Sequence, residues 1–166
     1  MDQQNIDKII SNYLSKNIKF SEENISAVKL SLLDTLGCIY NASTYEDPMR
    51  FATRNVYGGN TNPFKVLVDM QSSNEIARYF SILTRWFDYN DTFLAKEWAH
   101  PSDNIGTAFA YFINHKEKNI SQFLQSIIQM YEIQGSLALG TSLNKKGYDH
   151  VFYVKLASGA VYSSLL

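Results

Sequence analysis

Apolar residues recur at helical spacing along most of this chain, and this periodicity limits the possible folds more than any other feature. In residues 5–17 the apolar side chains fall at i, i+3, i+4, i+7 and i+8, the spacing of one helix face. They are Ile6, Ile9, Ile10, Tyr13 and Leu14. Similar patterns begin near residues 21, 72, 100, 121 and 149. The sequence therefore predicts an all-α domain.

Helix-start signals support these segments. Ser21 offers an N-cap and is followed by two acids that complement the helix dipole. The sequence "SSNE" at residues 72–75 matches a capping box. We expect Ser121 to start the next long helix and Asp149 to cap the last one.

Two short segments depart from this pattern. Pro48 can open a short helix, which we expect the pair Gly58-Gly59 to end. The run "NPFKVLVDM" has three consecutive apolar residues at 66–68. It predicts at most a minor β element near residues 64–68.

Composition excludes several classes of protein. The 166 residues contain 45% hydrophobic residues, which is enough for one globular core. A net charge of -1 without a Lys/Arg cluster argues against nucleic-acid and anionic-membrane partners. No apolar run approaches the ~18 residues of a membrane span. Cys38 is the one cysteine, and the N-terminal residues lack an apolar run, so we expect a cytoplasmic protein.

The apolar pattern of the last segment continues to Leu165 and Leu166 without a glycine, a proline or a basic final turn. A helix usually ends with one of these signals. We therefore expect residues 1–166 to be a single helical domain at the start of a longer protein, or an excised domain.

The stretch "WFDYNDTFLAKEWAHPSDN", residues 86–104, interrupts the helices with aromatic and titratable side chains. The titratable ones are Asp88, Asp91, Lys96, Glu97, His100 and Asp103. Asn, Asp and Thr also form turns and helix caps, so the pattern alone leaves two readings open. The stretch is either an elaborate turn or a chemical site.

The residue types favour acid–base chemistry if the stretch is a site. An EF-hand would need Gly at the position of Phe93 and Glu at the position of Ala99, so we expect no metal ion. A nucleophile elbow and a phosphate-binding glycine loop are both missing, and we expect no cofactor. A histidine flanked by carboxylates, as His100 is, can exchange protons near neutral pH. For His150 the pattern leaves open helix-start packing or function.

The segment "RWFDYNDTFLAKEWAHPSDNIG", residues 85–106, closely resembles the signature of the MmgE/PrpD family, and within it the 2-methylcitrate dehydratases. Three further segments resemble the family in its own order: "LLDTLGC" at 32–38, "YEIQG" at 131–135 and "DHVFYVKLAS" at 149–158. The resemblance thus covers the chain from about residue 32 onward. Ala99 departs from the Gly expected before the histidine.

This resemblance implies a large helical domain followed by a smaller α+β domain, in a homodimeric enzyme. It implies metal-free, cofactor-free loss of water from 2-methylcitrate, a small tricarboxylate. It also implies that four residues line the pocket and that two more are candidate substrate-binding residues. The four are Asp88, Thr92, His100 and His150, and the two are Lys96 and Gln134.

The expected chemistry needs a base for a carbon-bound proton and an acid for the leaving hydroxide. We expect His100 to transfer one proton while Asp88 orients it, and Thr92 to hydrogen-bond to the substrate. His150 would bind a carboxylate or act as the partner acid.

Few cations lie near the motifs: Arg85, Lys96 and Lys155. Because a tricarboxylate needs cationic partners, we expect these 166 residues alone to turn it over little or not at all. Two alternatives stay open. One is another lyase of the family, an aconitate-type dehydratase or a cis-aconitate decarboxylase, although the "LAKEW" segment favours the dehydratase. The other is a non-catalytic helical module that assembles with a partner chain.

Overall fold

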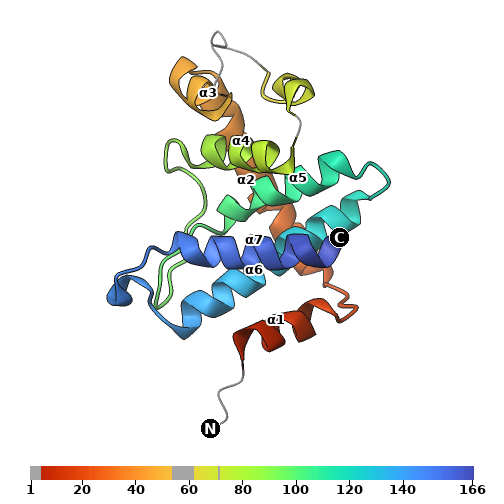
Figure 1. The fold of residues 1–166 in the computed structure, drawn as a ribbon, viewed down its shortest axis with the longest axis vertical. Helices are drawn as coiled ribbons and strands as arrows, with labels where there is room; N and C mark the ends of the chain where they lie inside the picture. Colours follow the sequence, from red (N-terminus) through yellow and green to blue (C-terminus); the bar gives the residue numbers. More distant parts are fainter. Residues whose placement is uncertain (1–4, 54–61, 71) are drawn as a thin grey trace.

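The computed structural model describes residues 5–53, 62–70 and 72–166, and over these ranges the protein is helical (Figure 1). The α-helices are α1 (Ile6–Leu14), α2 (Glu22–Ser43), α3 (Glu46–Thr53), α4 (Ser73–Arg85), α5 (Ile105–Asn114), α6 (Ile120–Gly140) and α7 (Val151–Leu165). Short 3₁₀ helices are η1 (Lys65–Asp69), η2 (Pro101–Asn104) and η3 (Asn144–Lys146). The described ranges contain no β-strand, which confirms the all-α prediction. No described helix has the length and apolar character needed to cross a membrane.

Local capping explains why α2 and α4 begin where the sequence predicts. The Ser72 hydroxyl accepts from the backbone N–H of Glu75 at 3.3 Å, and the Glu75 carboxylate accepts from the Ser72 N–H at 3.0 Å. Ser21 and Asn24 exchange the same pair of bonds at the start of α2. Each reciprocal pair satisfies amides that the helix itself leaves without a partner.

The helix α6 begins one residue before the predicted start. Asn119, not Ser121, is its N-cap: the Asn119 side chain accepts from the Gln122 N–H at 3.0 Å. The Gln122 side chain accepts in turn from the Asn119 N–H at 3.1 Å. Ser121 has no partner three residues on that could close such a box, so the earlier cap is the more stable one.

The minor β element predicted near residues 64–68 is wrong, because the chain forms η1 there. The Asn62 side chain accepts from the Phe64 N–H at 2.9 Å, and the Asn62 carbonyl accepts from the Lys65 N–H at 3.0 Å. These bonds start a tight turn, and Val66 is buried against the core. A short apolar run is compatible with a buried helical turn as well as with a strand. Gly58 and Gly59 lie outside the described residues.

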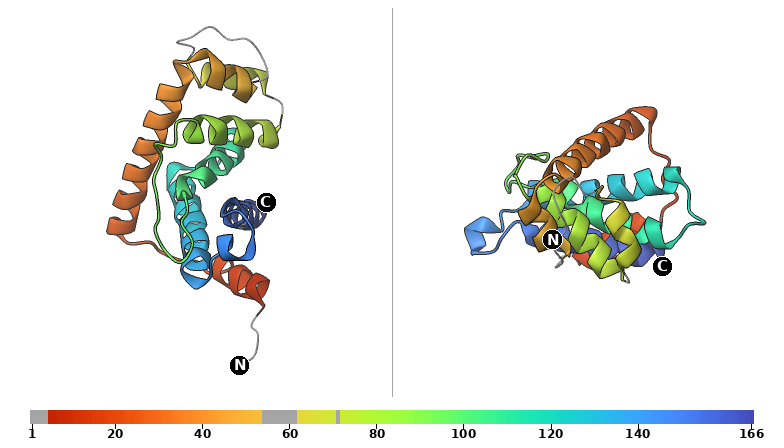
Figure 2. Two further views of the ribbon diagram at one scale, coloured as in Figure 1. Left: turned by 90° about the vertical axis from the view of Figure 1, so that its left-hand side faces the viewer. Right: turned by 90° about the horizontal axis from the view of Figure 1, so that it is seen from above.

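Two apolar clusters form the core, and α2 extends from one to the other along one side of the molecule (Figure 2). The first cluster joins α5, α6 and α7 to Val28 of α2, and its centre includes Ile127, Met130 and Val161. The second joins α3 and α4 to Ile39 of α2. Phe109 of α5 packs against both clusters. Helix α5 therefore connects the two halves of the core.

Helices α4 and α5 pack closely because α5 has a glycine at the contact. A Cβ atom on Gly106 would lie 2.5 Å from the Ser81 Oγ and 2.7 Å from the Ala77 carbonyl oxygen. Both distances are shorter than a carbon atom tolerates. Gly106 therefore sets the spacing of the two helices that lead into and out of the signature segment.

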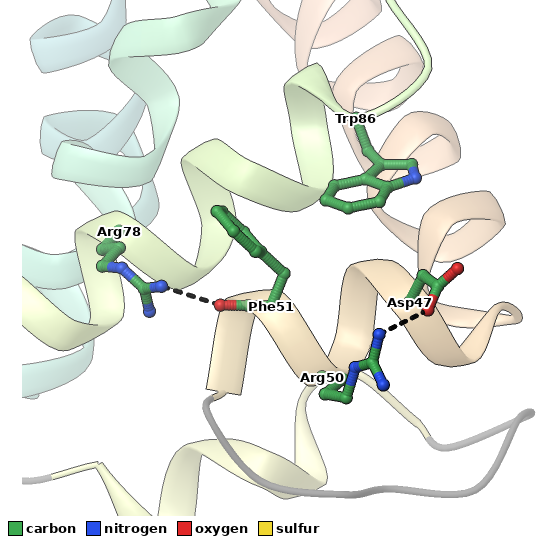
Figure 3. A pocket seen from close by; sticks show the side chains of 5 residues that line it. All are labelled: Asp47, Arg50, Phe51, Arg78 and Trp86. Carbon is green, nitrogen blue, oxygen red and sulfur yellow. Dashed lines mark hydrogen bonds and ion pairs between the residues drawn. The ribbon is translucent and has the colours of Figure 1, made fainter.

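Helix α3 is joined to α4 through the Arg78 side chain and a pair of aromatic rings (Figure 3). The Arg78 guanidinium donates to the carbonyls of Ala52 and Phe51, both at 2.7 Å, and so caps the C-terminal end of α3. The rings of Phe51 and Trp86 lie 5.8 Å apart and border a surface pocket of about 440 Å³ together with Arg50. No histidine lines this pocket. The contact between Phe51 and Trp86 packs the start of the signature segment against α3.

Candidate active site

The segment between α4 and η2 folds back on itself, so that its two halves meet. Phe93 and Ala99 form an isolated antiparallel bridge, with backbone N···O distances of 2.8 and 2.9 Å. Five residues between them form the tip of the loop. The bridge brings Asp91, which precedes it, beside His100, which follows it.

The His100 ring is buried and has one fixed hydrogen bond. Its Nδ1 lies 2.7 Å from the backbone carbonyl oxygen of Asp91. A carbonyl can only accept, so Nδ1 carries the proton in the neutral ring and Nε2 keeps a lone pair. The Nε2 atom lies 3.9 Å from the Asp88 carboxylate, which is longer than a hydrogen bond but close for two charges. The ring is thus oriented by a backbone group and faces a carboxylate.

Asp88 occupies an unusual backbone conformation. Its φ of 59° lies in the left-handed region, which Asp adopts more readily than most residues. An ion pair with Arg85 holds the carboxylate, and Arg85 also donates to the Asn90 side chain at 3.3 Å. Such backbone strain persists where surrounding contacts enforce it. Here it turns the Asp88 side chain toward His100.

His150 precedes α7 and approaches His100 from another part of the chain. The ring centroids of the two histidines are 5.8 Å apart. The Trp98 ring contacts both, with centroids 3.9 Å from His150 and 5.4 Å from His100. The three rings form one aromatic cluster at the base of the signature loop. Figure 1 shows the C-terminal end of α4 and the N-terminal end of α7 on the same side of the molecule.

The protonation of His150 follows from its surroundings. Burial lowers the pKa of His150, and the charges of His100 and Arg85 lower it further, against the opposing effect of Asp149. The Nδ1 atom lies 3.0 Å from the Asp149 carboxylate, so it carries the proton of the neutral ring. Nε2 is buried, and no described residue hydrogen-bonds to it. The ring therefore presents an unpartnered acceptor atom.

The comparisons with known proteins identify the family of this domain. The profile of the MmgE/PrpD N-terminal domain matches residues 8–166. The chain belongs to the MmgE/PrpD family. The resemblance seen in the sequence is thereby confirmed.

Several curated relatives are named 2-methylcitrate dehydratases. A probable 2-methylcitrate dehydratase of Saccharomyces cerevisiae is 33% identical over 184 aligned positions, covering 99% of this chain and 36% of the relative. The mitochondrial 2-methylcitrate dehydratase of Yarrowia lipolytica is 34% identical, covering 98% of this chain and 34% of its own length. The 2-methylcitrate dehydratase of Escherichia coli K12 is 37% identical, covering 81% and 30%. The chain thus spans about a third of the length of these relatives.

Besides Asp88, the carboxyl of Asp103 in η2 lies near the histidine pair of this MmgE/PrpD domain. Asn90 is buried, and its side-chain amide donates to the Ser102 hydroxyl at 2.9 Å and to the Asp103 carboxyl at 3.1 Å. Burial raises the pKa of Asp103 to about 6, more than the charges of Arg85 and His100 lower it. Asp103 is therefore a carboxyl that titrates near the range of a histidine.

Glu97 is a buried carboxylate that fastens the signature loop to the loop before α7. It accepts from the Asn144 backbone N–H at 2.7 Å and from the Ser142 hydroxyl at 3.0 Å. The Asn144 hydrogen bond is the main cause that lowers the pKa of Glu97, against the opposing effect of burial. The Glu97 N–H also donates to the carbonyl of Ala138 on α6 at 3.0 Å. Glu97 thus fixes the segment that leads to His150.

The structure brings Asp88, His100 and His150 together. The other predicted residues, Thr92, Lys96 and Gln134, lie elsewhere in the domain. Thr92 is exposed on the signature loop. The ammonium group of Lys96 is also exposed and donates to the carbonyl of Gly140 at 3.4 Å, at the end of α6. Lys96 therefore lies apart from the histidine pair in this conformation.

Gln134 lies inside the domain and belongs to a buried polar network. Its side-chain oxygen accepts from the Asn104 amide, and the Asn104 oxygen accepts from the Ser158 hydroxyl at 2.7 Å. The Gln134 Nε2 is buried and has no hydrogen-bond partner among the described residues. The network joins η2, α6 and α7 beneath the site.

Sequence reasoning did not identify Asn104, Ser158 or Trp98 as parts of the site. A signal existed for Asn104, because it is an amide beside the apolar face of a helix and must find partners when buried. Its partners come from α6 and α7, and local spacing does not reveal such long-range contacts. Among the described residues, no group of three or more His, Cys, Asp or Glu side chains is placed to hold a metal ion.

Proposed function

We propose that this chain supplies the histidine pair of a lyase that removes water from 2-methylcitrate to give 2-methyl-cis-aconitate. The observation that carries the proposal is the pairing of His100 and His150, whose ring centroids are 5.8 Å apart. Each ring has its Nδ1 held by an acceptor, so each Nε2 can exchange a proton with one bound molecule. The names of the relatives supply the substrate.

The reaction breaks one C–H bond and one C–O bond. A base takes the carbon-bound proton, the electrons of that bond form the C=C bond, and the hydroxide leaves with a proton from an acid. The lowered pKa of His150 keeps its ring neutral and suits the base. His100 then acts as the acid and donates a proton from Nε2, the atom that lies 3.9 Å from the Asp88 carboxylate. No step in this scheme needs a metal ion or a cofactor.

The remaining predicted residues have less direct roles in this proposal. Thr92 hydrogen-bonds to the substrate from the exposed rim of the loop. Gln134 holds Asn104 and so supports the floor of the site. Lys96 reaches the substrate only if its side chain leaves the carbonyl of Gly140.

The activity belongs, in this proposal, to a complete enzyme of the relatives' length. The relatives are about three times as long as this chain, and a tricarboxylate needs more cationic partners than the described residues place at the site. We therefore expect little turnover from residues 1–166 alone. The homodimer and the cytoplasmic location also remain predictions.

Product analysis on the complete protein tests the function. The protein is incubated separately with 2-methylcitrate, citrate and cis-aconitate, and the products are identified by NMR. We expect 2-methyl-cis-aconitate from 2-methylcitrate, and a loss of about 10²- to 10⁴-fold in kcat for His100→Gln and His150→Gln. Preferred use of citrate would identify an aconitate-type dehydratase, and loss of CO₂ from cis-aconitate would identify a decarboxylase.

His115→Gln is the matched control. The His115 ring stacks on Tyr111 and its Nδ1 lies 2.8 Å from the Tyr111 carbonyl, outside the site. This variant should keep full activity. If no substrate is consumed although the protein is folded, the chain is a non-catalytic helical module and the proposal is wrong.

A further inference from the structure

A groove beside the histidine pair is not used by the chemistry described above. It has a volume of about 450 Å³ and lies between α4 and α7, with η2 and α5 at its base. Its lining residues on α7 fall at i, i+3, i+4 and i+7, which is one helix face. They are Val151, Val154, Lys155 and Ser158. The groove therefore begins one residue after His150.

Two cations line this groove from opposite helices. Arg85 comes from the last turn of α4, and Lys155 comes from the second turn of α7. Arg85 pairs with Asp88 and so belongs to both the groove and the histidine site. Lys155 is exposed and forms no ion pair with any described residue. Its ammonium group is thus available to an anion bound beside the histidines.

The wall between these cations is apolar, with hydroxyl groups and the Asp103 carboxyl at its edges, and that carboxyl accepts from the Asn90 amide at 3.1 Å. The two cations outnumber the one acid among the residues that line the groove. Ile82, Val151 and Val154 supply alkyl surface, and Ser81 and Thr107 supply the hydroxyls. A carboxylate on a short alkyl chain combines a charge for the cations with carbon surface for this wall. A fully hydrated inorganic anion would use the cations alone.

The geometry points to a carboxylate subsite in this groove, in which Lys155 and Arg85 bind one carboxylate arm of the substrate while the alkyl wall contacts the adjoining carbon chain. The substrate class is therefore a short-chain polycarboxylate with one arm beside the histidine pair. This inference rests on the proposed function for the position of the reacting carbon. Of the three cations that the sequence places near the motifs, it assigns this role to Arg85 and Lys155 and not to Lys96.

Binding of propane-1,2,3-tricarboxylate, which has no hydroxyl group to lose, tests the subsite without catalysis. Calorimetry on the complete protein compares the parent with Lys155→Gln. We expect about tenfold weaker binding for Lys155→Gln, because one charge-assisted contact is removed. Lys155→Arg should restore most of the affinity. Lys145→Gln, which removes an exposed lysine of η3, is the matched control and should bind like the parent.

Methyl NMR locates the ligand, since the signals of Val151 and Val154 should shift with the tricarboxylate but not with inorganic phosphate. Equal affinity of the parent and Lys155→Gln, or shifts confined to residues outside the groove, would overturn the inference. Its failure is distinguishable from failure of the proposed function. If the parent dehydrates 2-methylcitrate but Lys155→Gln binds the tricarboxylate as tightly as the parent, the subsite is wrong and the proposed function stands. If binding depends on Lys155 but no dehydration occurs, the proposed function is wrong and the subsite stands.

Discussion

His100 and His150 lie with their ring centroids 5.8 Å apart, although helices α5 and α6 separate them along the chain. The Trp98 ring contacts both of them. The Asp91 carbonyl holds one Nδ1 and the Asp149 carboxylate holds the other. Both rings are therefore held at Nδ1, which leaves each Nε2 available to the substrate that we propose.

Replacement of Asp88 by Asn separates its charge from its backbone conformation. Asn adopts the left-handed region about as readily as Asp, so the free energy of unfolding should change by less than about 1 kcal/mol. The charge opposite His100 is lost, and kcat should fall about tenfold or more. Urea unfolding and steady-state kinetics measure the two effects. Unchanged kcat in Asp88→Asn would remove Asp88 from the mechanism.

Glu97→Gln should destabilise the protein by about 2–4 kcal/mol, because a Gln side chain cannot accept all the bonds from Asn144 and Ser142 as strongly. The folded-state pKa of Glu97 is depressed below 4.5, so its stabilising effect is present above that pH and is lost as the pH falls through the folded value. Urea unfolding at several pH values measures both. The exposed Glu46→Gln on α3 is the control and should change little. Equal losses in the two variants would contradict the role of Glu97.

The contribution of Asp103 to the free energy of unfolding should change with pH in the opposite direction to that of Glu97, and Asp103→Asn tests this. Burial raises the folded-state pKa of Asp103 from 3.8 to about 6, so the parent loses stability as the pH rises between these values. The loss is at most about 3 kcal/mol, since one pKa unit corresponds to about 1.4 kcal/mol. Asp103→Asn should therefore be more stable than the parent at about pH 8 and nearly equal to it near pH 3.5. A constant difference at all pH values would show that Asp103 does not titrate in this range.

Gly106→Ala should destabilise the protein by about 1–3 kcal/mol, because the added methyl group meets the Ser81 hydroxyl and the Ala77 carbonyl. The control is Gly159→Ala in α7, where a Cβ atom meets nothing within 4 Å. There the substitution should stabilise by about 0.5–1 kcal/mol, since alanine favours a helix. Thermal unfolding of both variants measures this. Similar effects of the two substitutions would show that α4 and α5 are not closely packed at Gly106.

The sequence predicts the helices well because their signals are local. The capping box of Ser72 and Glu75 and the N-cap at Ser21 both lie within one turn of the residues they affect. The run at 66–68 fails because three apolar residues suit a buried turn as well as a strand, and Asn62 decides for the turn. Asn119 was missed as a cap for a related reason, since Ser121 is also a good cap type.

The site was predictable to the extent that one motif contains it. Asp88 and His100 lie in the same loop, and the His100 Nε2 lies 3.9 Å from the Asp88 carboxylate. The contact between His100 and His150 depends on how α5 and α6 pack, which spacing does not encode. Lys96 and the adjacent Glu97 both contact the end of α6 and the loop after it, because the Lys96 ammonium reaches the carbonyl of Gly140 and the Glu97 carboxylate accepts from Ser142. Local spacing does not encode these long-range contacts. The groove at Lys155 is assembled from α4, η2, α5 and α7 and has no sequence motif.

Nitrogen NMR of the His150 ring during a pH titration tests the central claim most directly. We predict a neutral ring at neutral pH with its proton on Nδ1, and a pKa below that of an exposed histidine, because the ring is buried and Nε2 has no partner among the described residues. A His150 ring that is doubly protonated at neutral pH, or that carries its proton on Nε2, would contradict the assignment of His150 as the base.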